Sequence, residues 1–82
     1  MRLPDLTKCR CVLLLSRRWG MNLARAIDTL RVLVKNVVAA TEIDKELARE
    51  ISEEKFDKFL YLNDEGSEIR ELDKETFQKF SK

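Results

Sequence analysis

The chain has 82 residues, of which 44% are hydrophobic and 38% are charged, and its net charge is +1. This composition predicts a single soluble domain with one small core and a Lys- and Glu-rich surface that resembles those of heat-adapted proteins. The longest apolar run, Cys11–Leu15, is far shorter than the ~18 residues of a membrane span or a secretory signal core. We therefore expect a cytoplasmic protein with no membrane partner.

The residues that carry most catalytic chemistry are missing. The chain contains no histidine, so no Cys-His or Ser-His nucleophilic pair can form. Cys9 and Cys11 are too close for an unstrained disulfide and supply only two of the four ligands of a structural zinc site. Gly20 and Gly66 stand alone, without a glycine-rich phosphate loop. We expect no catalytic residue, no metal site, no cofactor and no enzyme activity.

Residues 1–20 favour an N-terminal helix. Pro4-Asp5 suits the first turn of a helix, Arg17-Arg18 suits the last turn, and Gly20 can end it in a left-handed conformation. A strand over Cys9–Leu15 is the alternative, because that segment ends in a continuous apolar run.

The strongest helical periodicity follows Asn22, which we expect to cap a second helix. Apolar residues recur at steps of three and four over Leu23–Val38, with charged residues on the opposite face. The valines near its end are poor helix formers, so its last turns depend on packing. Thr41 is then expected to cap a short helix over Glu42–Ile51.

Ser52–Leu62 predicts a further helix, with carboxylates in its first turn. Asn63–Gly66 has turn chemistry between two short apolar alternations, which predicts a β-hairpin. Asp73 caps a last helix over residues 73–82, in which Phe77 and Phe80 share one face. The whole is a mainly α domain with a small β-hairpin, divided into an N-terminal helix over 1–20, a core over 22–72 and this C-terminal helix.

The order of elements over residues 23–72 resembles that of the winged helix-turn-helix DNA-binding family. Leu23–Val38 resembles its support helix, Glu46–Glu50 its second helix, Ser52–Leu62 its recognition helix, and Asn63–Gly66 the entry to its wing. The resemblance implies a helix in the major groove of DNA. It also implies a small DNA-binding or transcription-associated regulator.

On this resemblance, six basic residues would contact DNA. Three of them would contact nucleobases or the groove, namely Lys55, Lys58 and Arg70. The other three would bind phosphates, namely Arg17, Arg18 and Arg49. The presumed recognition helix nevertheless presents three acidic residues against two basic ones, which opposes phosphate binding. The rival hypothesis is a protein–protein interaction module without nucleic-acid binding. If Lys55, Lys58 and Arg70 all pair with neighbouring acidic residues, the interaction module is favoured.

A shorter segment carries a second resemblance. Arg17-Arg18-Trp19-Gly20 leads into residues 22–28 in a way that resembles the strand-to-helix segment of archaeal Alba-type chromatin proteins. That resemblance implies nucleic-acid binding through the basic residues of this segment.

Charge divides the chain into two halves. Residues 1–40 hold eight basic and two acidic residues, a balance of +6, and residues 41–82 hold eight basic and thirteen acidic residues, a balance of −5. The acidic half could bind a basic protein partner, or the halves could attract each other within a monomer or across a homodimer. For a homodimer, the first helix would supply the interface through Leu13, Leu14, Leu15 and Trp19.

Overall fold

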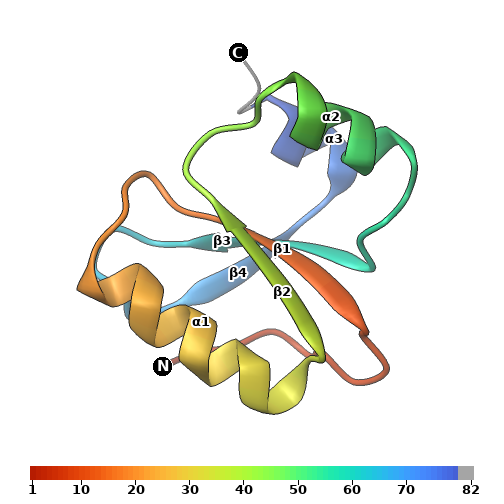
Figure 1. Cartoon of the computed structure of the whole chain (residues 1–82). Coiled ribbons are helices and arrows are strands. Elements are labelled where there is room, and N and C mark those ends of the chain that lie inside the picture. The colour runs from red at the N-terminus through yellow and green to blue at the C-terminus, as the bar shows by residue number, and fades with distance from the viewer. Residues whose placement is uncertain (80–82) are drawn as a thin grey trace.

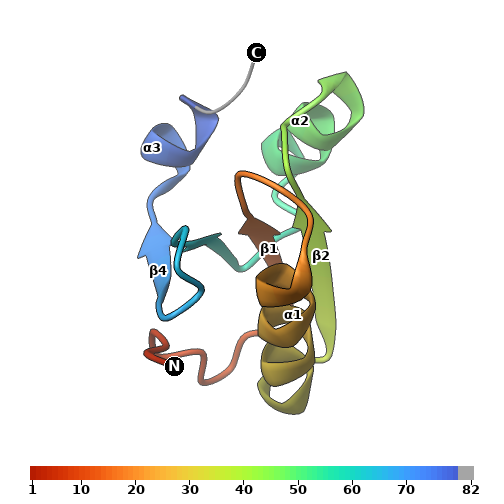
Figure 2. The ribbon, with the colours of Figure 1, turned by 90° about the vertical axis from the view of Figure 1, so that its left-hand side faces the viewer.

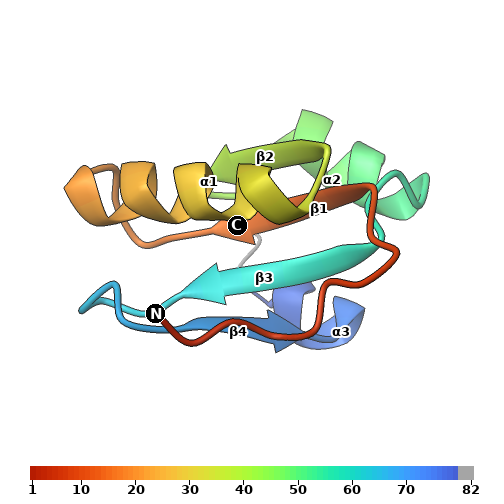
Figure 3. The same cartoon turned by 90° about the horizontal axis from the view of Figure 1, so that it is seen from below.

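The computed structural model describes residues 1–79 as a four-stranded sheet with three helices (Figure 1). In chain order these are β1 (Cys11–Leu15), α1 (Met21–Leu33), β2 (Asn36–Ala40), α2 (Lys45–Ser52), β3 (Lys58–Leu62), β4 (Ile69–Leu72) and α3 (Lys74–Gln78). The strands lie in the order β2-β1-β3-β4, as Figure 3 shows. β1 is parallel to both β2 and β3, whereas β4 is antiparallel to β3.

The sheet is covered on both faces. On one face, Val12 and Leu14 of β1 pack with α1, which runs alongside β2 (Figure 2). On the other face, Leu13 and Leu15 pack with residues of α2 and with Phe77 of α3. The connection from β1 to β2 and the connection from β2 back past β1 to β3 cross the sheet in opposite directions. Because such crossover connections between parallel strands have the same hand, α1 and α2 lie on opposite faces of the sheet. A strand buried on both faces is continuously apolar, which explains the run from Val12 to Leu15.

Asp57 fixes the start of β1 against the start of β3. Its carboxylate accepts hydrogen bonds from the backbone N–H groups of Arg10 (2.7 Å) and Cys11 (3.1 Å). Its own N–H donates to the carbonyl oxygen of Cys11 at 2.8 Å. The two backbone donors hold the pKa of the Asp57 carboxyl below its usual value, because they favour the charged form.

The N-terminal segment lies against the outer edge of β4. Arg2 forms an isolated parallel β-bridge with Glu68 through the backbone. The N–H of Arg2 donates to the carbonyl oxygen of Ser67 (3.1 Å), and its carbonyl oxygen accepts from Ile69 N–H (2.9 Å). Leu6 is buried in the cluster beneath α1. The segment therefore satisfies backbone groups at one edge of the sheet, whereas within residues 1–79 the outer edge of β2 has no neighbouring strand.

The expected fold class, a mainly α winged-helix-like domain, is wrong. The structure has four strands and three short helices in a mixed α+β arrangement. Residues 9–15 follow the strand alternative, since β1 spans Cys11–Leu15, and no helix occupies residues 1–20. The helix expected over Leu23–Val38 ends at Leu33, and the valines that follow lie in or directly before β2.

The expected recognition helix over Ser52–Leu62 is also wrong. Only Ser52 is helical, as the last residue of α2, and residues 58–62 form β3. Phe56, Phe59 and Leu60 mimic a helical stripe by their spacing. In the structure Phe56 and Phe59 pack with the α2–α3 cluster and Leu60 packs beneath α1, so they lie on both faces of the sheet rather than on one.

Two local predictions are confirmed, and a third is confirmed in part. β3 and β4 form the hairpin around Asn63–Gly66, and Asp73 caps α3 by accepting from Thr76 N–H at 2.7 Å. The short helix expected over Glu42–Ile51 is present as α2, but it begins at Lys45 and its cap is Asp44 rather than Thr41. Phe80 and the other residues expected at the end of that helix lie outside the described residues. Among residues 1–79, none of the helices has both the length and the apolar character that crossing a membrane requires.

The Asp57 bonds predict a characteristic acid dependence. Because the folded-state pKa is lowered, the carboxylate stabilises the fold at neutral pH and loses this effect as pH falls below the ordinary aspartate value of about 3.9. Asp57→Asn should lower the melting temperature at pH 7, and the gap to wild type should close below about pH 4. Thermal melts by circular dichroism check this. Asp28→Asn, at an exposed position of α1, is the control, and a gap that persists at pH 2 would contradict the assignment.

Candidate functional site

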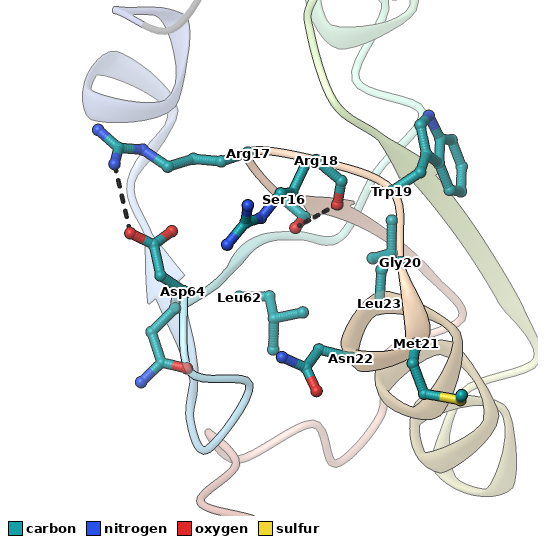
Figure 4. A pocket seen from close by; sticks show the side chains of 11 residues that line it. Ser16, Arg17, Arg18, Trp19, Gly20, Met21, Asn22, Leu23, Leu62 and Asp64 are labelled. Carbon is teal, nitrogen blue, oxygen red and sulfur yellow. Dashed lines mark hydrogen bonds and ion pairs between the residues drawn. The ribbon is translucent and has the colours of Figure 1, made fainter.

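A pocket lies where the carboxyl ends of β1 and β3 meet. The chain leaves these adjacent strands in opposite directions, from β1 toward β2 and from β3 toward β4. In open sheets with helices on both faces, ligands bind at such a point, outside the carboxyl ends of the strands. The pocket has a volume of about 270 Å³, and Figure 4 shows the side chains around it. Its lining includes Ser16, Arg17, Arg18, Trp19, Asn22 and Asp64.

Ser16 shapes the loop between β1 and α1. Its N–H donates to the carbonyl oxygen of Ala40 (3.0 Å), which extends the pairing of β1 with β2. Its buried hydroxyl donates to the carbonyl oxygen of Arg18 at 3.1 Å. This bond folds residues 16–18 back on themselves, so that both arginines leave the sheet at the rim of the pocket.

Arg17 and Arg18 supply the positive charge of the site. Arg17 reaches across to Asp64, with Nη1 3.3 Å from Oδ2, and the two side chains are 71% and 53% exposed. Ion pairs this exposed contribute about 1 kcal/mol or less, so Arg17 can exchange its partner for a stronger anion. Arg18 points into the space between the two strand ends, and Trp19 projects away from both arginines (Figure 4).

The first turn of α1 opens on the same pocket. Its N-cap is Gly20, which has no side chain to accept a hydrogen bond, and the turn contains no acidic residue. The N–H groups of Met21, Asn22 and Leu23 have no acceptor within a helix that begins here. Free N–H groups and the positive end of the helix dipole favour an anion. A side chain at position 20 would meet nothing within 4 Å.

Gly66 brings the hairpin turn close to Asn22, which lines the pocket. It has φ +72°, and a Cβ atom there would lie 2.6 Å from Cγ of Asn22. The backbone of the turn can lie this close to α1 only because glycine has no side chain. The turn itself is held by Asn63, whose side-chain oxygen accepts from the N–H groups of Ser67 (2.9 Å) and Glu68 (3.1 Å).

The structure separates the other basic residues that the sequence suggested. Arg49 lies exposed on α2, away from the pocket. Lys55 pairs with Glu53 (3.5 Å), Lys58 with Glu71 (3.1 Å) and Arg70 with Glu68 (3.0 Å). The hydrogen bond that Lys58 donates to the Glu71 carboxylate raises the pKa of Lys58. These three bases are thus paired with neighbouring acids, and only Arg17 and Arg18 of the predicted set share a site.

The residues expected to form a dimer interface also separate. Leu13, Leu14 and Leu15 are almost completely buried in the central strand, so they cannot contact a partner in the folded state and are core residues. Trp19 differs from them, since it is 63% exposed at the rim of the pocket.

Sequence reasoning missed Asp64 and the direct role of the α1 terminus. Asn22 was expected to cap a helix that in fact begins two residues earlier, at Met21, with Gly20 as its N-cap. The signal for the site was present, because an apolar run followed by two arginines, a glycine and a periodic helix is the pattern of a strand, a loop and a helix. The segment compared with Alba-type proteins does connect a strand to a helix here.

The two thiols show no sign of activation. Cys9 and Cys11 are free and partly buried, and burial raises the pKa of both, which disfavours the reactive thiolate. Within residues 1–79, no cluster of three or more acidic or cysteine side chains is placed to hold a metal ion.

Comparisons with protein-family models, curated proteins and solved structures give no match.

The contact at Gly66 makes a direct prediction for the site. Gly66→Ala would force a side chain against Asn22 and place a non-glycine residue at positive φ, which alone costs roughly 1–2 kcal/mol. We expect a lower melting temperature and amide shift changes at Asn22 and its neighbours in NMR spectra. Gly20→Ala, where the added Cβ meets open space, is the control. Unchanged stability and unchanged Asn22 signals in Gly66→Ala would contradict the close approach.

Proposed function

We propose that the protein binds single-stranded nucleic acid at the pocket between β1 and β3, without catalysing a reaction on it. The observation that carries the proposal is the convergence of Arg17, Arg18 and the uncapped N-terminus of α1 on one pocket. Paired basic side chains with free backbone N–H groups suit a phosphate oxygen. A backbone phosphate of a nucleic acid would replace Asp64 as the partner of Arg17.

The exposed Trp19 supports a nucleic acid over a free phosphate ion. Single strands are bound by basic grooves that follow the backbone and by aromatic side chains on which unpaired bases stack. Trp19 is largely exposed and projects away from the two arginines (Figure 4), so it would stack on a base of the strand where the strand continues beyond the bound phosphate. Arg25, exposed one turn further along α1, extends the positive charge along the helix.

Two observations favour a single strand over duplex DNA as the ligand. The helix that the winged-helix resemblance placed in the major groove is not formed, because residues 58–62 form β3. The basic residues that were expected to contact nucleobases are paired with acidic residues; these are Lys55, Lys58 and Arg70. Binding through a loop, a helix terminus and one aromatic side chain matches an accessible backbone with exposed bases. For such a ligand we retain the expectation of a cytoplasmic protein.

A protein–protein interaction module is the second candidate function. The pairing of those three basic residues with acids favours it over a groove-reading regulator. Titration with nucleic acid separates the two candidates. An interaction module that has lost nucleic-acid binding would show no response to either strand form at low salt.

Titration of a labelled oligonucleotide of about 16 nucleotides tests the proposal. We expect anisotropy to rise with the single strand more than with the matching duplex, and the fluorescence of Trp19, the only tryptophan of the chain, to be quenched. Arg17→Ala combined with Arg18→Ala should weaken binding by about tenfold or more and lower the salt slope by about 1.4. Arg49→Ala, an exposed arginine outside the pocket, should bind as wild type does.

Gly20→Asp separates binding from folding. An aspartate at this N-cap can accept a hydrogen bond from the first turn and so stabilise α1 by a few tenths of a kcal/mol, while its charge occupies the anion position. We expect an unchanged or higher melting temperature together with loss of oligonucleotide binding. Wild-type affinity in this variant, or no binding by the wild-type protein at low salt, would refute the proposed site.

A further inference from the structure

The two edges of the sheet differ sharply. The β4 edge has the N-terminal segment bonded to its start and carries Arg70 and Glu71, and a covered or charged edge resists pairing with another chain. The β2 edge, Asn36-Val37-Val38-Ala39-Ala40, is uncharged and almost wholly apolar. Figure 3 shows β2 at one side of the sheet, with no strand beyond it in the described part of the chain.

The β2 edge offers free backbone groups in a regular pattern. Asn36 N–H donates to Arg10, and the Ala40 carbonyl accepts from Ser16, so residues 36, 38 and 40 direct their backbone groups toward β1. In a strand the intervening residues direct theirs the opposite way. The N–H and C=O groups of Val37 and Ala39 therefore face outward from the sheet.

Charge along this edge is arranged with opposite signs at its two ends. At the end where β2 begins lie exposed Arg10, Arg31 and Lys35. At the end where β2 finishes, Glu42, Asp44, Glu46 and Glu50 line a groove of about 240 Å³ together with residues 38–40. An antiparallel arrangement of two copies would bring each acidic end against the other copy's basic end, as a two-fold interface requires.

We propose that two copies of this chain pair through β2, antiparallel and centred on Val38, to form one continuous eight-stranded sheet. Each Val37 would exchange two backbone hydrogen bonds with the partner's Ala39, and each Ala39 with the partner's Val37. Lys35 lies opposite the partner's Thr41 and beside the partner's Glu42. A second copy fits better than an unrelated basic chain because the edge is complementary to itself in both backbone pattern and charge.

One exposed apolar side chain lies at the centre of this edge. Val38 is 38% exposed, and in this register the two Val38 side chains lie directly opposite each other across the two-fold axis. Burial of Val38 on each copy gives the pairing an apolar component besides its hydrogen bonds.

Light scattering coupled to size-exclusion chromatography, run over rising protein concentration, tests the pairing. Wild type should approach twice the mass of one chain. Val38→Lys should be monomeric, because it places two like charges directly opposite each other, and Val38→Thr, which adds no charge, should still dimerise. Ala39→Pro should also be monomeric, since it removes an outward N–H that the single chain does not use. Circular dichroism establishes that each variant is folded.

Hydrogen exchange gives a second readout at the residues themselves. The amides of Val37 and Ala39 should be protected at high protein concentration and exchange rapidly on dilution, while that of Val38 stays protected at both. A wild-type monomer at all concentrations, or a folded Val38→Lys that remains dimeric, would overturn the proposal. So would a monomer whose Val37 and Ala39 amides gain protection only when oligolysine is added, because the edge would then bind a basic peptide instead.

Discussion

The structure depends on the pairing of one short, fully buried strand with parallel neighbours on both sides. β1 pairs with β2 through Cys11–Leu15 and with β3 through Val12–Leu15, and its side chains are covered on both faces. Every other element is placed by this strand. α1 connects β1 to β2, and α2 connects β2 back past β1 to β3. The pocket forms where the chain leaves β1 toward α1 and β3 toward β4. The site is therefore a consequence of the strand order rather than a separate addition to the fold.

Two local signals in the sequence predicted local structure correctly. The turn residues Asn63–Gly66 indicated the hairpin, and Asp73 indicated the start of the last helix, since both effects act within a few residues. Pairing between distant strands has no such local signal. The run Val12–Leu15 suits a buried helix as well as a buried strand, and Phe56, Phe59 and Leu60 have helical spacing although they lie on two faces of a sheet.

The candidate site was predictable only in its basic half. Arg17 and Arg18 stand out as a charged pair between two apolar segments, and their proximity to a helix start is local. Asp64 and Gly66 arrive from more than forty residues further along the chain, because β3 lies beside β1. The acids that pair with Lys58 and Arg70 were visible in the sequence, but their distances depend on the register of β3 against β4. Charge counting alone could not assign which bases remain free.

The division of charge along the chain takes a specific form in three dimensions. The basic half supplies β1 and β2 and the acidic half supplies β3 and β4, so the boundary between halves is the β1–β3 pairing. Interactions cross that boundary, as Asp57 does with the backbone of Arg10 and Asp64 does with Arg17. The halves thus attract each other within one molecule. Since β1 is parallel to β2, antiparallel pairing of two copies would place the two pockets at opposite ends of the dimer, where each remains open to its ligand.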